Sequence, residues 1–436
     1  MEPQSKSPKI VVKMNFPYLA TVAVALLLLF IGHRVATQRT FVFQDDTQEV
    51  VRATVQRVLE RAPQGGDLGR FEQGEDFWGL EGWDEVGGRD FGDDSYGFAN
   101  EFDYDFGDFL SMMLMRGEAL TFEAEITRGP RRGQIVTASQ SFDGFVQDAF
   151  REVTAGDSIL LITFGEEWFF NGFHRSGRLF ILGILFALGV LIFGGKKGFN
   201  ALLSLGLTCA AVFAVFIPAI LSEMNIYLMA ILLCVYTTVV TLLIVIGYNK
   251  KSLAAAVGCL SGIAITGIIA VVMDRVLFLT GVVDEHSRFL MFLEIDGEIN
   301  LRAIIFAGII IGAMGAILDV AMSISSALWE IKKNAQTVSF ESLLRSGMTI
   351  GRDVFGTMAN TLILAYIGTS LSVILLLLVF TDSLTGLLND ERIVVEILQA
   401  LSGSFGILLT MPLTSLFCAT IYVKKGVRRK NKSTAS

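Results

Sequence analysis

Eight long apolar runs dominate this chain of 436 residues and leave few folds open to it. A helix needs about 20 apolar residues to cross the hydrocarbon core of a bilayer, and most of the runs reach that length. In chain order the runs are Phe16–Val35, Leu179–Phe193, Ala201–Leu221, Ile226–Ile246, Leu253–Met273, Ala303–Leu328, Val354–Phe380 and Val394–Val423. Because 52% of the residues are hydrophobic and only 18% are charged, the sequence predicts an α-helical polytopic membrane protein with eight transmembrane helices.

Clusters of positive charge orient these runs, because loops rich in lysine and arginine stay in the cytoplasm. If all eight runs span, the lysine clusters all fall on one side: Lys6, Lys9 and Lys13, Lys196 and Lys197, Lys250 and Lys251, Lys332 and Lys333, and the C-terminal lysines from Lys424 on. The prediction is a cytoplasmic N-terminus (1–15), a transmembrane anchor (16–35), a seven-helix domain (177–423) and a basic cytoplasmic tail (424–436). A cleaved signal peptide is the alternative for the first run, but residues 33–37 offer no small-x-small cleavage site.

Residues 38–176 then lie outside the membrane, between the first and second helices. Four segments read as strands: Thr47–Leu59, Leu120–Thr127, Gln134–Ser139 and Ser158–Phe164. Two dipeptides typical of turns separate these segments. Gly129-Pro130 lies between the second and third, and Gly156-Asp157 precedes the fourth. Short strands with glycine turns predict a small extracytoplasmic domain of the β-barrel or sandwich type.

An acidic, glycine-rich segment at residues 64–109 interrupts this domain. It includes Asp90–Asp94 (DFGDD) and Glu101–Asp108 (EFDYDFGD), and no apolar periodicity runs through it. Such a composition predicts a disordered insertion. A weak site for a divalent cation or a cationic partner is the alternative, although the spacing fits no EF-hand loop.

One carboxylate, Asp319, stands inside the sixth run, roughly 24 Å below its outer end at 1.5 Å per residue. It shares a helical face with Gly308, Gly312, Gly315 and Ser323. The glycines allow close helix packing. A charge inside the membrane normally faces a cavity or a partner.

The seventh run carries polar residues at a matching depth: Arg352, Asp353, Thr357 and Asn360, together with the small Gly356. Asp319, Ser323, Thr357 and Asn360 are therefore predicted to meet in the inner half of the membrane. In one hypothesis Asp319 is a structural lock, hydrogen-bonded to Asn360 or paired with Arg352. In the other it is an ion or proton site on a transport path.

No motif of an enzyme is present. There is no Walker A sequence, no HExxH and no GxSxG, so we expect no catalytic residues, no enzyme activity and no cofactor, and the sequence specifies no metal site. The four cysteines lie in apolar runs and indicate no disulfide framework. The expected partners are the lipid bilayer, an ion or small solute, and another copy or a related membrane subunit, but no nucleic acid.

Two segments, Gly312–Ile331 (GAMGAILDVAMSISSALWEI) and Ser346–Leu371 (SGMTIGRDVFGTMANTLILAYIGTSL), closely resemble the YibE/F-like family of bacterial multi-pass membrane proteins. The resemblance covers residues 1–60 and 118–425, whereas segment 64–109 departs from it. The family pattern falls on Gly312, Gly315, Asp319, Ser346, Gly347, Gly351, Arg352, Asp353, Gly356, Thr357, Asn360 and Thr361. The resemblance implies a fold and a location in the bacterial cytoplasmic (inner) membrane, and it implies no substrate.

The sequence thus favours a permease for an ion or small solute. A non-transport alternative stays open: an envelope-organising or regulatory membrane protein whose β domain binds an extracytoplasmic partner. A third is the membrane subunit of a larger complex, docked through a short surface helix at Ser339–Gly347 with Phe340, Leu343 and Leu344 buried.

Overall fold

The computed structural model describes most of the helices and strands, in two compact units. The described residues are 16–37, 49–63, 118–142, 151–165, 167–283, 285–291, 299–335, 338–380 and 383–423. One unit comprises residues 42–185, and the other comprises residues 1–41 and 186–436. The acidic segment 64–109 and the two termini, 1–15 and 424–436, lie outside the described residues, so the predictions about them stay predictions.

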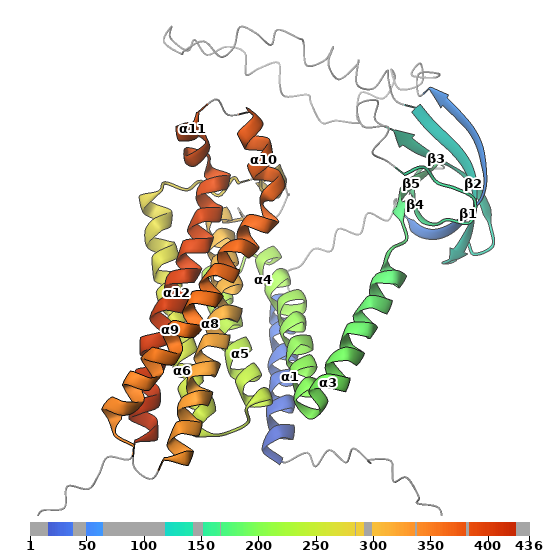
Figure 1. Ribbon diagram of the computed structural model, residues 1–436. Helices are drawn as coiled ribbons and strands as arrows, with labels where there is room; N and C mark the ends of the chain where they lie inside the picture. The colour runs from blue at the N-terminus through green and yellow to red at the C-terminus, as the bar shows by residue number, and fades with distance from the viewer. Residues whose placement is uncertain are drawn as a thin grey trace, which may run out of the picture. The chain divides into compact units, whose positions relative to one another are not determined.

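Five strands build the smaller unit (Figure 1). They are β1 (Val50–Pro63), β2 (Glu118–Arg128), β3 (Ile135–Phe142), β4 (Ser158–Phe164) and β5 (Glu167–Phe173). All neighbouring pairs are antiparallel except β3 and β5, which are parallel. Because β1 pairs with both β2 and β4, the order β1-β2-β3-β5-β4 closes on itself in a small mixed sheet.

Along the strands, side chains that point inward alternate with side chains that point outward, and the inward ones fill the interior of this sheet. In β2, Phe122, Ala124 and Ile126 are fully buried, and in β4 the same is true of Ile159 and Leu161. The four strands named from the sequence all occur, with boundaries shifted by a few residues. The fifth, β5, was not named, although its buried tryptophan completes the core.

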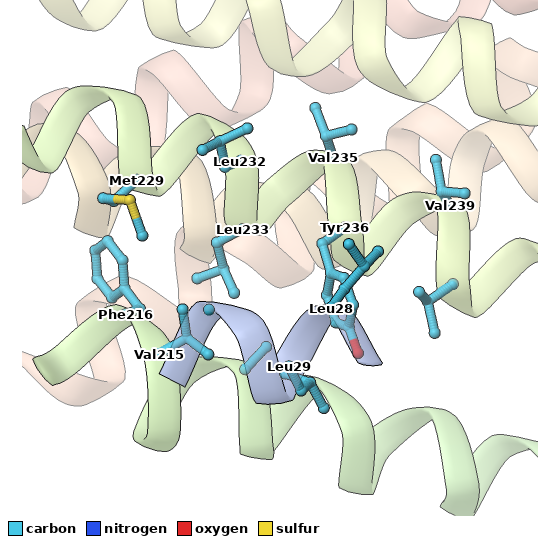
Figure 2. Close-up of a pocket in the computed structure, with 13 residues that line it drawn as sticks. Leu28, Leu29, Val215, Phe216, Met229, Leu232, Leu233, Val235, Tyr236 and Val239 are labelled. Carbon is cyan, nitrogen blue, oxygen red and sulfur yellow. The ribbon is translucent and has the colours of Figure 1, made fainter. Parts of the chain in front are cut away.

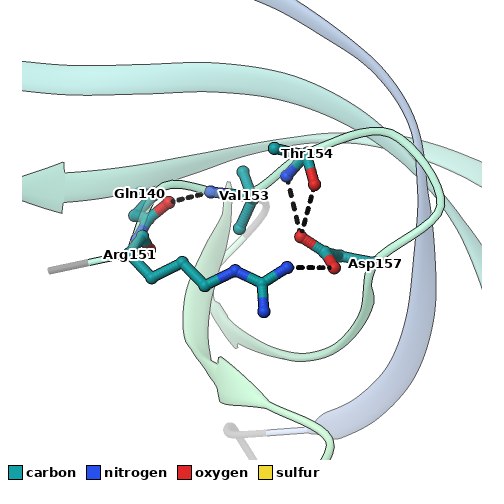
Figure 3. A network of polar contacts seen from close by, with 5 residues as sticks. All are labelled: Gln140, Arg151, Val153, Thr154 and Asp157. Carbon is teal, nitrogen blue, oxygen red and sulfur yellow. Dashed lines mark hydrogen bonds and ion pairs between the residues drawn. The ribbon is translucent and has the colours of Figure 1, made fainter.

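A polar network braces the turn before β4 (Figure 3). Asp157 accepts hydrogen bonds from the amide and hydroxyl of Thr154, at 2.9 and 2.8 Å, and pairs with Arg151 at 2.8 Å. Gln140 joins β3 to the same loop through the Arg151 carbonyl and the Val153 amide, both at 3.0 Å. Burial acts to raise the pKa of Asp157, but the Thr154 hydrogen bonds and the Arg151 charge outweigh it, so the pKa lies below its ordinary value.

The larger unit is a helical bundle (Figure 1). Its elements are α1 (Phe16–Ala36), α3 (Ser176–Ala211), the π-helical turn η3 (Val212–Phe216), α4 (Ile217–Leu221), α5 (Ile226–Val245), α6 (Lys250–Val276), α7 (Glu285–Met291), α8 (Leu301–Asn334), α9 (Phe340–Thr369), α10 (Leu371–Phe380), α11 (Leu384–Asn389) and α12 (Glu391–Tyr422). The first ten residues of α3 belong to the smaller unit.

By length and composition, six described helices can cross a membrane, or seven if the bent pair α9–α10 counts as one span. The predicted count of eight is therefore not confirmed. The second and third apolar runs lie in one stretch without an intervening loop, Ser176–Leu221, in which two helices meet at a sharp kink. Within it only Gly195 leaves helical geometry, with φ 52° and ψ −128°.

The predicted surface helix Ser339–Gly347 is wrong as a separate element, because it is the first part of α9. Ser339 caps this helix by accepting a hydrogen bond from the Ser342 amide at 3.1 Å. Leu343 is fully buried and Leu344 half-buried, whereas Phe340 is 40% exposed, against the prediction.

Helices α6, α8, α9 and α12 form the packed centre of the bundle. Glycine and threonine alternate along the line where α6 meets α12. The three pairs of this seam are Gly258 with Thr414, Gly262 with Thr410, and Thr266 with Gly406. On each glycine an added Cβ would collide with the threonine side chain opposite, so the two backbones approach as closely as glycine allows.

Candidate functional site

Most of the predicted face of α8 is exposed in the described part of the chain. A helix advances 3.6 residues per turn, so positions three and four apart share a face. The residues of this face are exposed, namely Gly308, Gly312, Gly315 and Asp319, with the half-buried Ser323 one turn further on. The opposite face is fully buried against α6 and α12 at Ile317 and Ile324.

Helix α9 has an open polar face as well. Its exposed residues are Arg352, Asp353, Gly356, Thr357 and Asn360. On the other side of α9, Gly347 packs against Ser415 of α12 and Gly351 against Met411. The predicted site residues therefore lie on the two faces that the bundle core leaves uncovered.

The register of α8 against α9 places the two polar faces at the same depth. Gly312 lies beside the Tyr366 hydroxyl, and Leu328 lies beside Gly347. The two helices run antiparallel, so moving forward along α8 corresponds to moving back along α9. Interpolating between these contacts brings Asp319 level with Thr357.

Asp319 nevertheless has no polar partner among the described residues. No hydrogen bond or ion pair joins it to Asn360 or Arg352. The Thr357 hydroxyl donates to a carbonyl of its own helix, that of Val354, at 3.0 Å. Neither contact of the lock hypothesis is therefore formed in the part of the chain that the structure describes.

A second polar group borders this face and was missed from the sequence. The Tyr366 hydroxyl and the Glu396 Oε2 atom are buried and have no hydrogen-bond partner among the described residues. Tyr366 belongs to α9 and Glu396 to α12, two helices that pack against each other, and the Tyr366 hydroxyl lies beside Gly312 of α8. The sequence could have indicated this group, because Glu396 is an acidic residue within an apolar run and, like Asp319, would be costly to expose to lipid.

A separate apolar cavity of about 390 Å³ lies between α1, η3 and α5 (Figure 2). Its walls include Leu28, Val215, Met229 and Leu232, and its lining contains no charged side chain. Tyr236 supplies the polar atom visible in Figure 2. This cavity cannot bind an ion by charge, so it does not extend the candidate site.

The π-helical turn beside this cavity has a local cause. Pro218 lacks an N–H group and cannot donate to the carbonyl of Ala214, four residues earlier. His33 of α1 compensates, because its Nδ1 donates to that carbonyl at 2.7 Å. Ser222 likewise donates to the Ala36 carbonyl at 2.5 Å, so two hydrogen bonds attach the end of α1 to this segment.

Among the described residues, no group of three or more histidine, cysteine, aspartate or glutamate side chains is placed to hold a metal ion. The polar faces therefore offer the carboxylates of Asp319 and Asp353, amide and hydroxyl groups, and the Arg352 guanidinium. Such groups can bind a small ion or solute reversibly, or pair with complementary groups on another chain.

Comparison with known proteins gives one match. A family model described as YibE/F-like protein matches residues 182–424. This span runs from α3 to the end of α12 and includes every residue of the candidate face. No curated protein and no solved structure matches the chain.

Proposed function

This chain belongs to the YibE/F-like family, and from that premise we propose that it is a membrane permease for an ion or a small solute. Its long apolar helices suggest a membrane protein. The proposal concerns what passes through it and where.

The exposed, unpaired carboxylate of Asp319 carries the proposal. It lies well inside α8, a helix long enough to span the bilayer. On insertion scales a charged residue at the centre of such a helix costs roughly 2.5–3.5 kcal/mol. In a lipid-facing position no interaction would offset this free-energy cost, so we propose that the face is in contact with water or with a transported ion.

The pathway needs a second wall, because the polar faces of α8 and α9 are open in a single chain. We propose that another membrane chain, either a second copy or a related subunit, covers them. Arg352 and Asp353 sit at the end of the α9 face and offer charges of both signs for such a contact.

The proposed topology has eight spans, with α3 counted as two arms and α9–α10 as one. An added Cβ at Gly198 would collide with the carbonyl of Val190, which supports a chain that folds back at Gly195 (Figure 1). The lysine-bearing bend of α3, the α5–α6 loop and the end of α8 lie at one end of the bundle in Figure 1. The positive-inside rule then puts that end, and both termini, in the cytoplasm of a bacterial inner membrane.

Cysteine accessibility tests the pathway directly. In a background with the exposed Cys209 replaced by serine, Gly315→Cys and Thr357→Cys should react with a charged, membrane-impermeant thiol reagent in intact vesicles. Ile268→Cys is the matched control, since Ile268 is 63% exposed on α6 but on an apolar surface.

Equal inertness of all three positions would contradict a water-filled path. If Gly315→Cys instead forms a disulfide between copies and stays unreactive to the charged reagent, the face is a dry subunit interface. That result would favour the alternative in which the chain organises or regulates a membrane complex.

A further inference from the structure

A groove of about 510 Å³ opens between the facing ends of α5 and α6, away from the candidate face. One part of its lining is apolar and includes Leu243 of α5 with Leu253 and Ala256 of α6. Leu253 is 57% exposed. Because these helices are candidate spans, the apolar part of the groove lies at the depth of lipid acyl chains.

The other part of the lining is polar and positively charged. Lys250 is exposed and forms no ion pair with any described residue. It is also the first residue of α6, where the backbone amides carry a partial positive charge. Lys251 follows it in the chain and adds a second positive charge near this end of α6.

Two more observations point to a ligand at this end. Ser252 lines the groove and is only 3% exposed, yet its hydroxyl makes no hydrogen bond within the described part of the chain. Tyr248, also in the lining, is 87% exposed beside an apolar wall. Tyrosine in such a position is typical of the membrane–water interface, where its ring meets lipid and its hydroxyl meets water.

We propose that this groove binds one anionic phospholipid. Its phosphate lies at the α6 N-terminus, within reach of the Lys250 ammonium and the Ser252 hydroxyl, and an acyl chain lies along Leu243 and Ala256. Charge complementarity selects an anionic headgroup, and the apolar wall selects a molecule with a hydrocarbon tail. The inference does not depend on the proposed transport function.

Lipid titration of the delipidated, full-length protein in detergent tests this site. Phosphatidylglycerol should raise the melting temperature in a saturable way, whereas phosphatidylcholine at the same concentration should have a much smaller effect. Lys250→Gln should weaken the apparent affinity for phosphatidylglycerol roughly fivefold, as expected for one lysine at a membrane surface. Lys333→Gln, which removes an exposed lysine at the end of α8, is the matched control and should leave the affinity unchanged.

A steric variant separates the groove from general charge attraction. Ala256→Phe fills the apolar part without changing charge and should also abolish saturable binding; if it does not fold, Leu253→Gln serves the same purpose. The proposal is overturned if phosphatidylcholine binds equally well, if Lys250→Gln and Lys333→Gln behave alike, or if inorganic phosphate stabilises as much as the lipid.

Discussion

The glycine–threonine seam between α6 and α12 makes a quantitative prediction at Gly262. An added Cβ there would collide with Thr410 Oγ1 and would lie 3.0 Å from a methyl group of Ile317. Both neighbours are fully buried, so neither can move aside into open space. Overpacking of a tight core costs about 1–3 kcal/mol, and we expect the collision in Gly262→Ala to lower the free energy of unfolding by that amount.

The change from glycine to alanine also alters helix propensity, by up to about 1 kcal/mol in the stabilising direction. Gly206→Ala in α3 measures the helix-propensity contribution alone, because an added Cβ there meets nothing within 4 Å. The difference between the two variants therefore isolates the seam and should be about 1–3 kcal/mol.

The native thiols supply the assay. Cys234, Cys259 and Cys418 are buried and free, so a thiol-reactive dye reports unfolding of the detergent-solubilised protein on heating. At about 2–4 °C per kcal/mol for a unit of this size, Gly262→Ala should melt several degrees below Gly206→Ala. Adding Thr410→Ala removes the colliding oxygen and should restore part of the loss. Equal melting of Gly262→Ala and Gly206→Ala would refute the close approach of the two helices.

Further predictions concern the β unit and the contact between α12 and the loop after α6. The folded pKa of Asp157 is lowered, so its stabilising contribution is present above the unfolded pKa of about 3.9 and is lost as the pH falls through the folded pKa. Asp157→Asn should therefore flatten the acid limb of a stability–pH curve recorded by circular dichroism, and an unchanged limb would contradict the network. Glu391 accepts hydrogen bonds from the Thr280 amide and hydroxyl and from the Gly281 amide, at 2.7–2.8 Å. Glu391→Gln keeps the shape but removes the charge and one acceptor, and should lower stability by about 1–3 kcal/mol in the thiol-dye assay; Glu341→Gln, on a fully exposed i,i+4 pair, should change it far less.

The polar face of α8 was predictable because helical periodicity is a local property of the sequence. The spacing of Gly312, Gly315 and Asp319 alone requires that they share one side of any helix. What covers that side depends on how each helix is rotated against its neighbours, so the sequence left both hypotheses for Asp319 open. The structure leaves most of that face exposed, with Gly312 beside the Tyr366 hydroxyl, and Asp319 has no hydrogen bond or ion pair among the described residues.

The glycine–threonine seam and strand β5 could not be predicted from single segments of the sequence, because both depend on contacts between segments far apart in the chain. Gly262 and Thr410 are far apart in sequence, and only the register of two packed helices brings them together. β5 is aromatic and contains Gly172, so its pattern is weak until the partner strands are in place. The sequence predicts the second and third apolar runs as separate helices, and a single glycine outside helical geometry, Gly195, forms the kink between them.

Ion flux in proteoliposomes tests the central proposal most directly. Vesicles carrying the purified protein are loaded with dyes that report H⁺, Na⁺, K⁺ or Mg²⁺, and a gradient of each ion is imposed in turn. Wild-type protein should dissipate at least one gradient faster than empty vesicles do. Asp319→Asn, which keeps the size of the side chain but removes its charge, should abolish that flux while the thiol-dye melting temperature stays within about 2 °C, the shift expected for at most 1 kcal/mol. Flux that is unaffected by Asp319→Asn, or wild-type vesicles that leak no faster than empty ones for any of the four ions, would contradict a permease built around this carboxylate.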